Sequence, residues 1–286
     1  MGAVHLAVTD AARSRRYYQE VVGLRVLSEA ADEVRLGSAG SALVVLHGGA
    51  SGPVEERRTG LYHLALVVPG QRELAGVVRR LVARGVDNYP TDHVETKSVY
   101  FWDPDGNGIE IYAESPEDGR LTWDEERGFS AVDADGRLRS GRDPIDLGRL
   151  FSHLEADDAL DDPLPAGARM GHVHLHVAAI DDALDFYHGI LGFDVKGASR
   201  RHGVAFVSAG GYHHHLGLNT WAGRGAPPRS TSASGLIEFA VRLPDIRALE
   251  AVTERLARSG LTPTADQESF TRLDPDGNRV RLTATD

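Results

Sequence analysis

The chain repeats itself, and this duplication limits its architecture more than any other feature of the sequence. Residues 5–24 (HLAVTDAARSRRYYQEVVGL) match residues 174–193 (HLHVAAIDDALDFYHGILGF) in an opening His-Leu, an aromatic pair and a closing Gly-apolar pair. Residues 101–112 (FWDPDGNGIEIY) match residues 272–283 (RLDPDGNRVRLT). Because two separate blocks recur in the same order, we infer a duplicated domain.

Each half divides again into two similar units. Residues 61–68 (LYHLALVV) and 235–241 (GLIEFAV) have the pattern of strands, and each precedes a segment with apolar residues at helical spacing. Short apolar strands and a DPDGN turn follow in both. We therefore predict an α+β fold of four βαβββ modules with mixed sheets.

The repeats also predict the domain boundaries. We assign residues 1–113 to an N-terminal domain, which holds the predicted metal site, and residues 171–286 to a C-terminal domain. Residues 114–170 between them are polar and acidic with scattered Gly and Pro. We expect this segment to be a surface linker strapped across both domains, without a catalytic role.

Composition excludes several classes of function. The formal net charge of -11, with no local cluster of Lys and Arg, argues against nucleic-acid binding. The chain has no run of about 18 apolar residues, so no membrane span is predicted. The N-terminus lacks the pattern of a signal peptide, which favours a cytoplasmic location. The chain has no cysteine, so a metal would have to be held by imidazole and carboxylate.

Three polar residues on predicted strands are candidate metal ligands. His5 and His63 lie in the first strands of modules one and two, and Glu110 lies between Ile109 and Ile111 in the last strand of module two. Side chains alternate across a strand, and equivalent places in a repeated fold can converge. Two imidazoles and one carboxylate form the facial triad of non-heme Fe(II) oxygenases. Spacing alone leaves open that both histidines are hydrogen-bonded strand residues and that Glu110 is a surface acid.

The arrangement resembles the vicinal oxygen chelate superfamily, which includes glyoxalases, bleomycin and fosfomycin resistance proteins and extradiol dioxygenases. Six segments resemble the two-domain bacterial catechol 2,3-dioxygenase-like proteins: YYQEVVGL, YHLAL, SVYFWDPDGNGIEIY, GHVHLHV, FYHGILGF and SAGGYHHHLGLNTW. The resemblance covers nearly the whole chain. It implies two tandem domains with curled sheets and an extradiol ring-cleaving dioxygenase that uses Fe(II) and O2 on a small aromatic diol. Mn(II) suits the same ligands.

The resemblance also implies two catalytic residues. Extradiol enzymes have a tyrosine ten residues before the ligand glutamate, and Tyr100 stands at that spacing from Glu110. They also carry an active-site histidine in the preceding loop, where this chain has His93, about two residues closer than in well-known members. We expect His93 to act as acid and base and Tyr100 to donate a hydrogen bond. A solvated loop histidine is the alternative for His93.

One departure from the family decides where the site is expected. Better-known two-domain extradiol enzymes hold iron in the C-terminal half, but here Arg281 replaces the glutamate and Glu238 replaces the second histidine. A guanidinium cannot ligate a metal. The C-terminal half is still rich in histidine, and His174 with His215 (or His214) and Glu238 is a rival site.

Other functions stay open at this point. A glyoxalase-like metal-dependent isomerase or lyase would need a second carboxylate, whereas the last strand of module one offers only His47. A non-enzymatic small-molecule or drug-binding protein of the same fold would need no metal. The sequence leaves the oligomeric state open and is compatible with a homo-oligomer.

Overall fold

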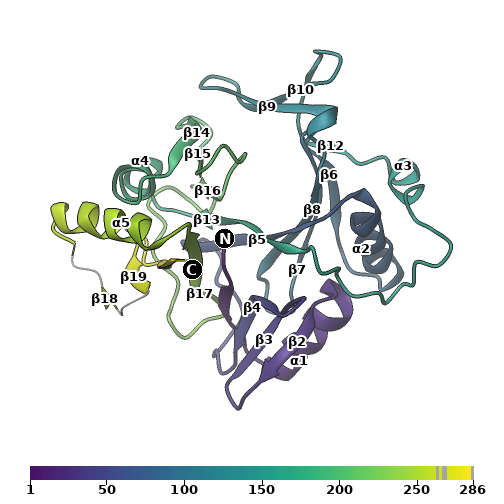
Figure 1. The fold of residues 1–286 in the computed structure, drawn as a ribbon, viewed down its shortest axis with the longest axis horizontal. Helices are drawn as coiled ribbons and strands as arrows, with labels where there is room; N and C mark the ends of the chain where they lie inside the picture. The colour runs from purple at the N-terminus through teal and green to yellow at the C-terminus, as the bar shows by residue number, and fades with distance from the viewer. Residues whose placement is uncertain (262–263, 266–268, 285–286) are drawn as a thin grey trace.

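The structure, a computed structural model, describes residues 1–261, 264–265 and 269–284. It confirms an α+β protein in which four βαβββ modules build two large mixed sheets, with a third, small sheet standing apart from them (Figure 1). No helix in the described part of the chain has the length and apolar character needed to cross a membrane.

The four modules follow one another along the chain. Module one comprises β1 (Val4–Ala7), α1 (Ala11–Tyr17) with its π-helical last turn η1 (Tyr18–Val22), β2 (Arg25–Glu29), β3 (Glu33–Ser38) and β4 (Ser41–His47). Module two comprises β5 (Gly60–Val68), α2 (Gln71–Ala83), β6 (Tyr89–Asp92), β7 (Thr96–Trp102) and β8 (Gly108–Glu114). Module three comprises β13 (Arg169–His176), α4 (Ile180–Leu184) with η3 (Asp185–Ile190), β14 (Asp194–Ser199), β15 (Val204–Ser208) and β16 (Leu216–Asn219). Module four comprises β17 (Gly235–Leu243), α5 (Ile246–Arg258), β18 (Thr264–Ala265), β19 (Ser269–Leu273) and β20 (Arg279–Ala284).

The modules pair across the two halves of the chain. The nine-stranded sheet has the order β12-β6-β7-β8-β5-β13-β16-β15-β14, so it joins modules two and three through the antiparallel pair β5 and β13. The eight-stranded sheet has the order β18-β19-β20-β17-β1-β4-β3-β2 and joins modules four and one through β17 and β1. Each predicted domain range, 1–113 and 171–286, thus contributes one module to each sheet. Both strand orders are open, so the strong curl expected of the sheets is not found.

The two repeated sequence blocks are contact partners. Tyr18, at the end of the first block, is buried and donates a hydrogen bond from its hydroxyl to Asp103 of the DPDGN turn, at 3.2 Å. Tyr187 and Asp274 make the same contact in the second half, at 2.8 Å. Each DPDGN turn thereby docks module two on module one, or module four on module three, which explains why both blocks occur in each half.

The nine-stranded sheet has one apolar and one polar face. Leu64 and Leu66 of β5 and Ile111 of β8 are buried in the core together with Leu74 and Leu81 of α2, which covers this face. Strand alternation sends the remaining side chains to the opposite face. That opposite face carries histidine, glutamate and tyrosine side chains.

The polar face is covered by the segment predicted to be a surface linker. We call residues 116–151 the strap; it contains η2 (Pro116–Asp118), β9 (Gly119–Asp124), β10 (Gly128–Asp133), β11 (Leu138–Arg139), β12 (Asp143–Pro144) and α3 (Leu147–Phe151). Strands β9 to β11 form the three-stranded sheet, which projects over the nine-stranded sheet (Figure 1). Trp123 packs on Phe206 of β15, with ring centroids 5.1 Å apart. Gly197 leaves room for it, because a Cβ there would lie 2.1 Å from the indole.

Candidate metal centre

A cavity of about 420 Å³ lies between the polar face of the nine-stranded sheet and the strap. The floor of the cavity is the junction of β5 and β13, so modules two and three both contribute to it. The strap supplies the facing wall. The lining residues are Tyr62, His63, Thr91, His93, Thr96, Tyr100, Glu110, Tyr112, Leu121, Phe129, Arg142, His172, His174, Val204, Phe206, His213, His214 and Trp221.

Two histidines and one glutamate meet on the cavity floor. Glu110 Oε2 lies 3.0 Å from His172 Nε2 and 3.1 Å from His63 Nε2, and all three side chains are buried. The register explains this meeting, because Glu110 of β8 and His172 of β13 flank Ala65 of β5 from both sides, while His63 lies two residues before Ala65 on the same face. One ligand atom from each residue lies within 4.8 Å of the other two.

His63 and Glu110 have the protonation states that a metal requires. Burial lowers the pKa of His63. Burial opposes ionisation of Glu110, but His172 and His63 outweigh it and hold the pKa of this carboxyl well below its usual range. His63 Nε2 is buried and, despite its 3.1 Å approach to the carboxylate, has no hydrogen-bond partner among the described residues. A neutral imidazole with an unused nitrogen beside a carboxylate anion is a ligand set for a divalent cation.

The structure does not bring His5 to this cluster. His5 lies in β1 of the eight-stranded sheet, opposite Glu238, and its Nδ1 is 3.0 Å from His47 Nε2. The predicted convergence assumed that module one pairs with module two. Module two pairs with module three instead, so His172 of β13 stands where His5 was expected.

His93 and Tyr100 lie together in the cavity wall. Tyr100 is opposite Glu110 in the register of β7 and β8, and its ring centroid is 5.4 Å from that of His63. His93 Nδ1 donates to the carbonyl oxygen of Gly141 in the strap at 2.5 Å, and Tyr100 donates its hydroxyl hydrogen to His93 Nε2 at 2.8 Å. A carbonyl can only accept, which places the proton of a neutral His93 on Nδ1. Burial lowers the pKa of His93 and raises that of Tyr100 well above its usual range.

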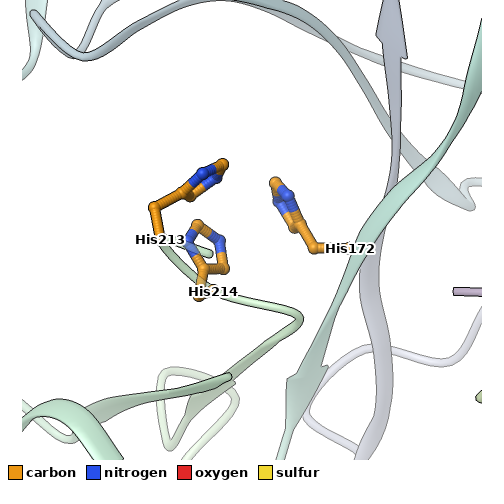
Figure 2. Close-up of side chains that lie close together, drawn as sticks. All are labelled: His172, His213 and His214. Atoms are coloured by element: carbon orange, nitrogen blue, oxygen red, sulfur yellow. The ribbon is translucent and has the colours of Figure 1, made fainter. Parts of the chain in front are cut away.

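A second histidine cluster shares His172. The rings of His172, from the middle of β13, and of His213 and His214, from the loop before β16, point toward one another (Figure 2). Their ligand atoms also lie within 4.8 Å of one another. Burial, followed by the neighbouring His172, lowers the pKa of His213 to about 3 and that of His214 well below its usual range. These two side chains are therefore neutral imidazoles, and with His172 they form a second group that could hold a metal.

The rival set predicted in the C-terminal half is not assembled. His174 lies on the cavity floor opposite His63, over Gly217, where a Cβ would be 2.7 Å from the imidazole. His215 hydrogen-bonds Ser208 Oγ at 2.9 Å instead of facing this cavity. Glu238 belongs to the other sheet and forms an ion pair with Arg281 at 2.6 Å.

Several residues of the site were missed by the sequence analysis. His172 had a signal, because it precedes His174 by two residues and therefore shares its strand face. The sequence gives little signal for the cavity residues of the strap, since a polar, acidic segment does not reveal which surface it covers. These residues are Leu121, Phe129 and Arg142. They contribute to the cavity only because the strap folds back on it.

Comparisons with known proteins bear on the family and the fold. The sequence model of the glyoxalase/bleomycin resistance protein/dioxygenase superfamily matches residues 1–111 and 169–282. The chain is 37% identical over 278 residues to the catechol-2,3-dioxygenase of Bacillus subtilis (strain 168), and the match covers 96% of this chain and 93% of that protein. Among solved structures, glyoxalase I from Zea mays has a TM-score of 0.58 at 17% identity, covering 99% of this chain and 92% of the maize chain. A Bacillus subtilis subsp. subtilis str. 168 protein has a TM-score of 0.61 at 16% identity, covering 99% and 85%. Both structural matches show a shared fold.

Proposed function

The chain belongs to the glyoxalase/bleomycin resistance protein/dioxygenase superfamily and is a homologue of catechol-2,3-dioxygenase, and we propose that it is an extradiol ring-cleaving dioxygenase with a metal held by His63, Glu110 and His172. The observation that carries this proposal is the buried cluster of these three residues on the floor of a cavity large enough for an aromatic diol. Fe(II) is the proposed ion, and Mn(II) suits the same two imidazoles and one carboxylate.

The residues present fit such an ion. Three protein ligands leave open positions for other molecules, and His63 Nε2 has no hydrogen-bond partner among the described residues. When bound, the metal would supply a centre that holds both hydroxyls of a catechol and O2 side by side and polarises them.

His93 and Tyr100 can manage the proton of a substrate hydroxyl. With its own proton on Nδ1 and donated to Gly141, His93 presents an unprotonated Nε2 to the Tyr100 hydroxyl. A substrate hydroxyl that hydrogen-bonds to Tyr100 Oη can pass its proton along this contact to His93 Nε2. Phe129 and Phe206 supply apolar wall around the ring, which excludes water from the reacting atoms.

The number of carboxylates favours ring cleavage over a glyoxalase-type reaction. Glyoxalase-like sites generally use two carboxylates, whereas Glu110 is the only Asp or Glu among the described residues that line this cavity. The fold resemblance to maize glyoxalase I does not change this, because one fold hosts many activities.

Anaerobic reconstitution with Fe(II) tests the proposal. After addition of catechol and air, we expect a yellow ring-opened product and consumption of one O2 for each ring opened. His172→Ala should abolish product formation, while the matched control His5→Ala in the other sheet should retain it. Absence of product across a panel of catechols would refute the dioxygenase assignment, and activity lost in H5A but kept in H172A would refute the ligand set.

A further inference from the structure

The cavity wall carries a permanent positive charge. Within the described part of the chain, Arg142 is the only Lys or Arg that lines the cavity, and the formal net charge of the protein is -11. It comes from the strap, one residue after Gly141, whose carbonyl oxygen accepts the hydrogen bond from His93. This bond fixes the backbone beside Arg142 against the catalytic wall. The same contact that orients His93 therefore places the backbone of Arg142 beside the cavity, and the Arg142 side chain itself is exposed.

The side chain of Arg142 is directed by an aromatic contact. Its Cζ atom lies 5.7 Å from the centroid of the Phe129 ring, within the range of a cation–π interaction. Phe129 in turn contacts His93 edge to face, with ring centroids 6.2 Å apart. The charge is felt inside the cavity, because Arg142 contributes to lowering the pKa of His93 after the larger effect of burial.

The guanidinium of Arg142 has no acidic partner among the described residues, unlike its neighbours in the strap. Arg137 pairs with Asp135 at 2.6 Å, and Arg139 pairs with Asp143 at 2.8 Å. Asp143, the residue next to Arg142, also accepts a hydrogen bond from Ser140, so its carboxylate is already used by other groups. The five N–H groups of Arg142 stay available to a ligand in the cavity.

We propose that Arg142 selects aromatic diols that carry a carboxylate on the ring or on a short side chain, by binding that carboxylate in the wall supplied by the strap. This inference rests on the proposed ring-cleaving function and names its substrate class. A guanidinium binds a carboxylate through two parallel hydrogen bonds, and one such group matches one monoanion. The cation–π contact with Phe129 limits the range of positions open to the guanidinium, so less side-chain entropy is lost on binding.

Binding of a non-reacting pair of ligands tests the selection without turnover. The ligands are 4-hydroxyphenylacetate and its neutral isostere 4-hydroxyphenylacetamide, titrated calorimetrically into the full-length protein, as purified, under nitrogen. We expect the wild type to bind the carboxylate about 10- to 100-fold more tightly than the amide, the range of a charge-assisted hydrogen-bond pair. Arg142→Gln should reduce the ratio to near one, Arg142→Lys should retain part of it, and the matched control Arg137→Gln, outside the cavity, should leave it unchanged.

Turnover of the corresponding diols separates this inference from the proposed function. With Fe(II)-loaded protein, 3,4-dihydroxyphenylacetate should exceed its amide in kcat/KM by a similar factor, and R142Q should remove the difference between these two diols. Equal binding of acid and amide by the wild type, or an unchanged ratio in R142Q, would overturn the role of Arg142 even if rings are opened. A preference for the acid in binding with no cleavage of any diol would leave the role of Arg142 intact and overturn the dioxygenase function.

Discussion

The centres of the two large sheets have the same geometry and opposite chemistry. In the nine-stranded sheet, His63 of β5 lies opposite His174 of β13, and in the eight-stranded sheet Glu238 of β17 lies opposite His5 of β1. Both first strands have an irregularity immediately after that histidine. The sheets are thus duplicate frames that differ in the side chains they present.

Three positions differ between the two frames, and the clearest is the one after the DPDGN turn. Glu110 follows the first DPDGN turn, and Arg281 occupies the equivalent place after the second. In one sheet, a carboxylate meets two imidazoles on a cavity floor. In the other, a guanidinium meets Glu238, at 2.6 and 3.2 Å. The comparison teaches that the same frame can serve a metal or an internal ion pair, depending on which residues stand at its equivalent positions.

The largest expected effect separates the two carboxylates. Glu110→Gln should lower the affinity for Fe(II) or Zn(II) by at least about 100-fold, because even supporting residues of metal sites contribute 10- to 100-fold. Glu238→Gln should leave the metal content of the purified protein unchanged. Elemental analysis after reconstitution measures both variants. Equal metal in E110Q and wild type would break the comparison.

Moving the ligand set of the nine-stranded sheet into the eight-stranded sheet tests whether the two frames are equivalent. Ala3 precedes His5 by two residues, as His172 precedes His174, so the triple variant A3H/E238H/R281E places the ligand set of one sheet in the other. We expect a second equivalent of Zn(II) to bind, more weakly than the first because no strap covers the new site. Calorimetric titration counts the equivalents, with E238H alone as the control that lacks the carboxylate after the DPDGN turn. A stoichiometry of one in the triple variant would show that the frames are not equivalent.

The ion pair of the eight-stranded sheet predicts a stability effect. Glu238→Gln leaves the guanidinium of Arg281 without its carboxylate, and we expect the free energy of unfolding to fall by about 1–2 kcal/mol, a value reduced because the arginine side chain is 40% exposed. Urea unfolding followed by circular dichroism measures it. An unchanged midpoint and slope would mean that the pair contributes nothing to folding.

The smallest expected effect compares the two DPDGN turns. The carboxylate of Asp105 accepts hydrogen bonds from Arg13 and Thr9, whereas the carboxylate of Asp276 accepts only the N–H of Ala178 among the described residues. Burial raises the pKa of Asp276 to about 6, from 3.8. The folded chain therefore keeps this proton in a window where the unfolded chain has lost it, and stability falls as the pH rises from about 4 to about 6.

Asp276→Asn removes that pH-dependent cost. At pH 7.5 we expect the variant to be more stable than the wild type by on the order of 1 kcal/mol after allowance for partial solvent screening, and no more stable at pH 4. Asp105→Asn, which loses the ion pair to Arg13, should be destabilised at pH 7.5. Unfolding curves at both pH values measure the free energy of unfolding of each variant. If D276N were still more stable than the wild type at pH 4, titration of Asp276 would not be the cause.

Much of the fold followed from local pattern. The duplication, the four βαβββ modules and the strand faces of His63, Tyr100 and Glu110 are set by periodicity and turn residues within a few positions. Local pattern does not determine which module pairs with which, because the first strand of each module has the same alternation and the same free edge. The pairing of β5 with β13 rather than β1 depends on contacts far apart in sequence, and the prediction of His5 as a ligand was wrong for that reason. The role of the strap could not be predicted either, since Leu121 and Phe129 line the cavity only through contacts with module three.

The crossed pairing of modules has a consequence for synthesis of the chain. His5 pairs with Glu238, more than 200 positions later, so the first strand emerges from the ribosome long before its antiparallel neighbour exists. Contacts of such sequence separation carry a large loop-closure entropy and slow the search for the native state. Modules two and three, whose first strands are closer in the chain, can assemble earlier. The nine-stranded sheet can then form while β1 still has one edge unpaired. An unpaired strand edge in a nascent chain is a site of aggregation.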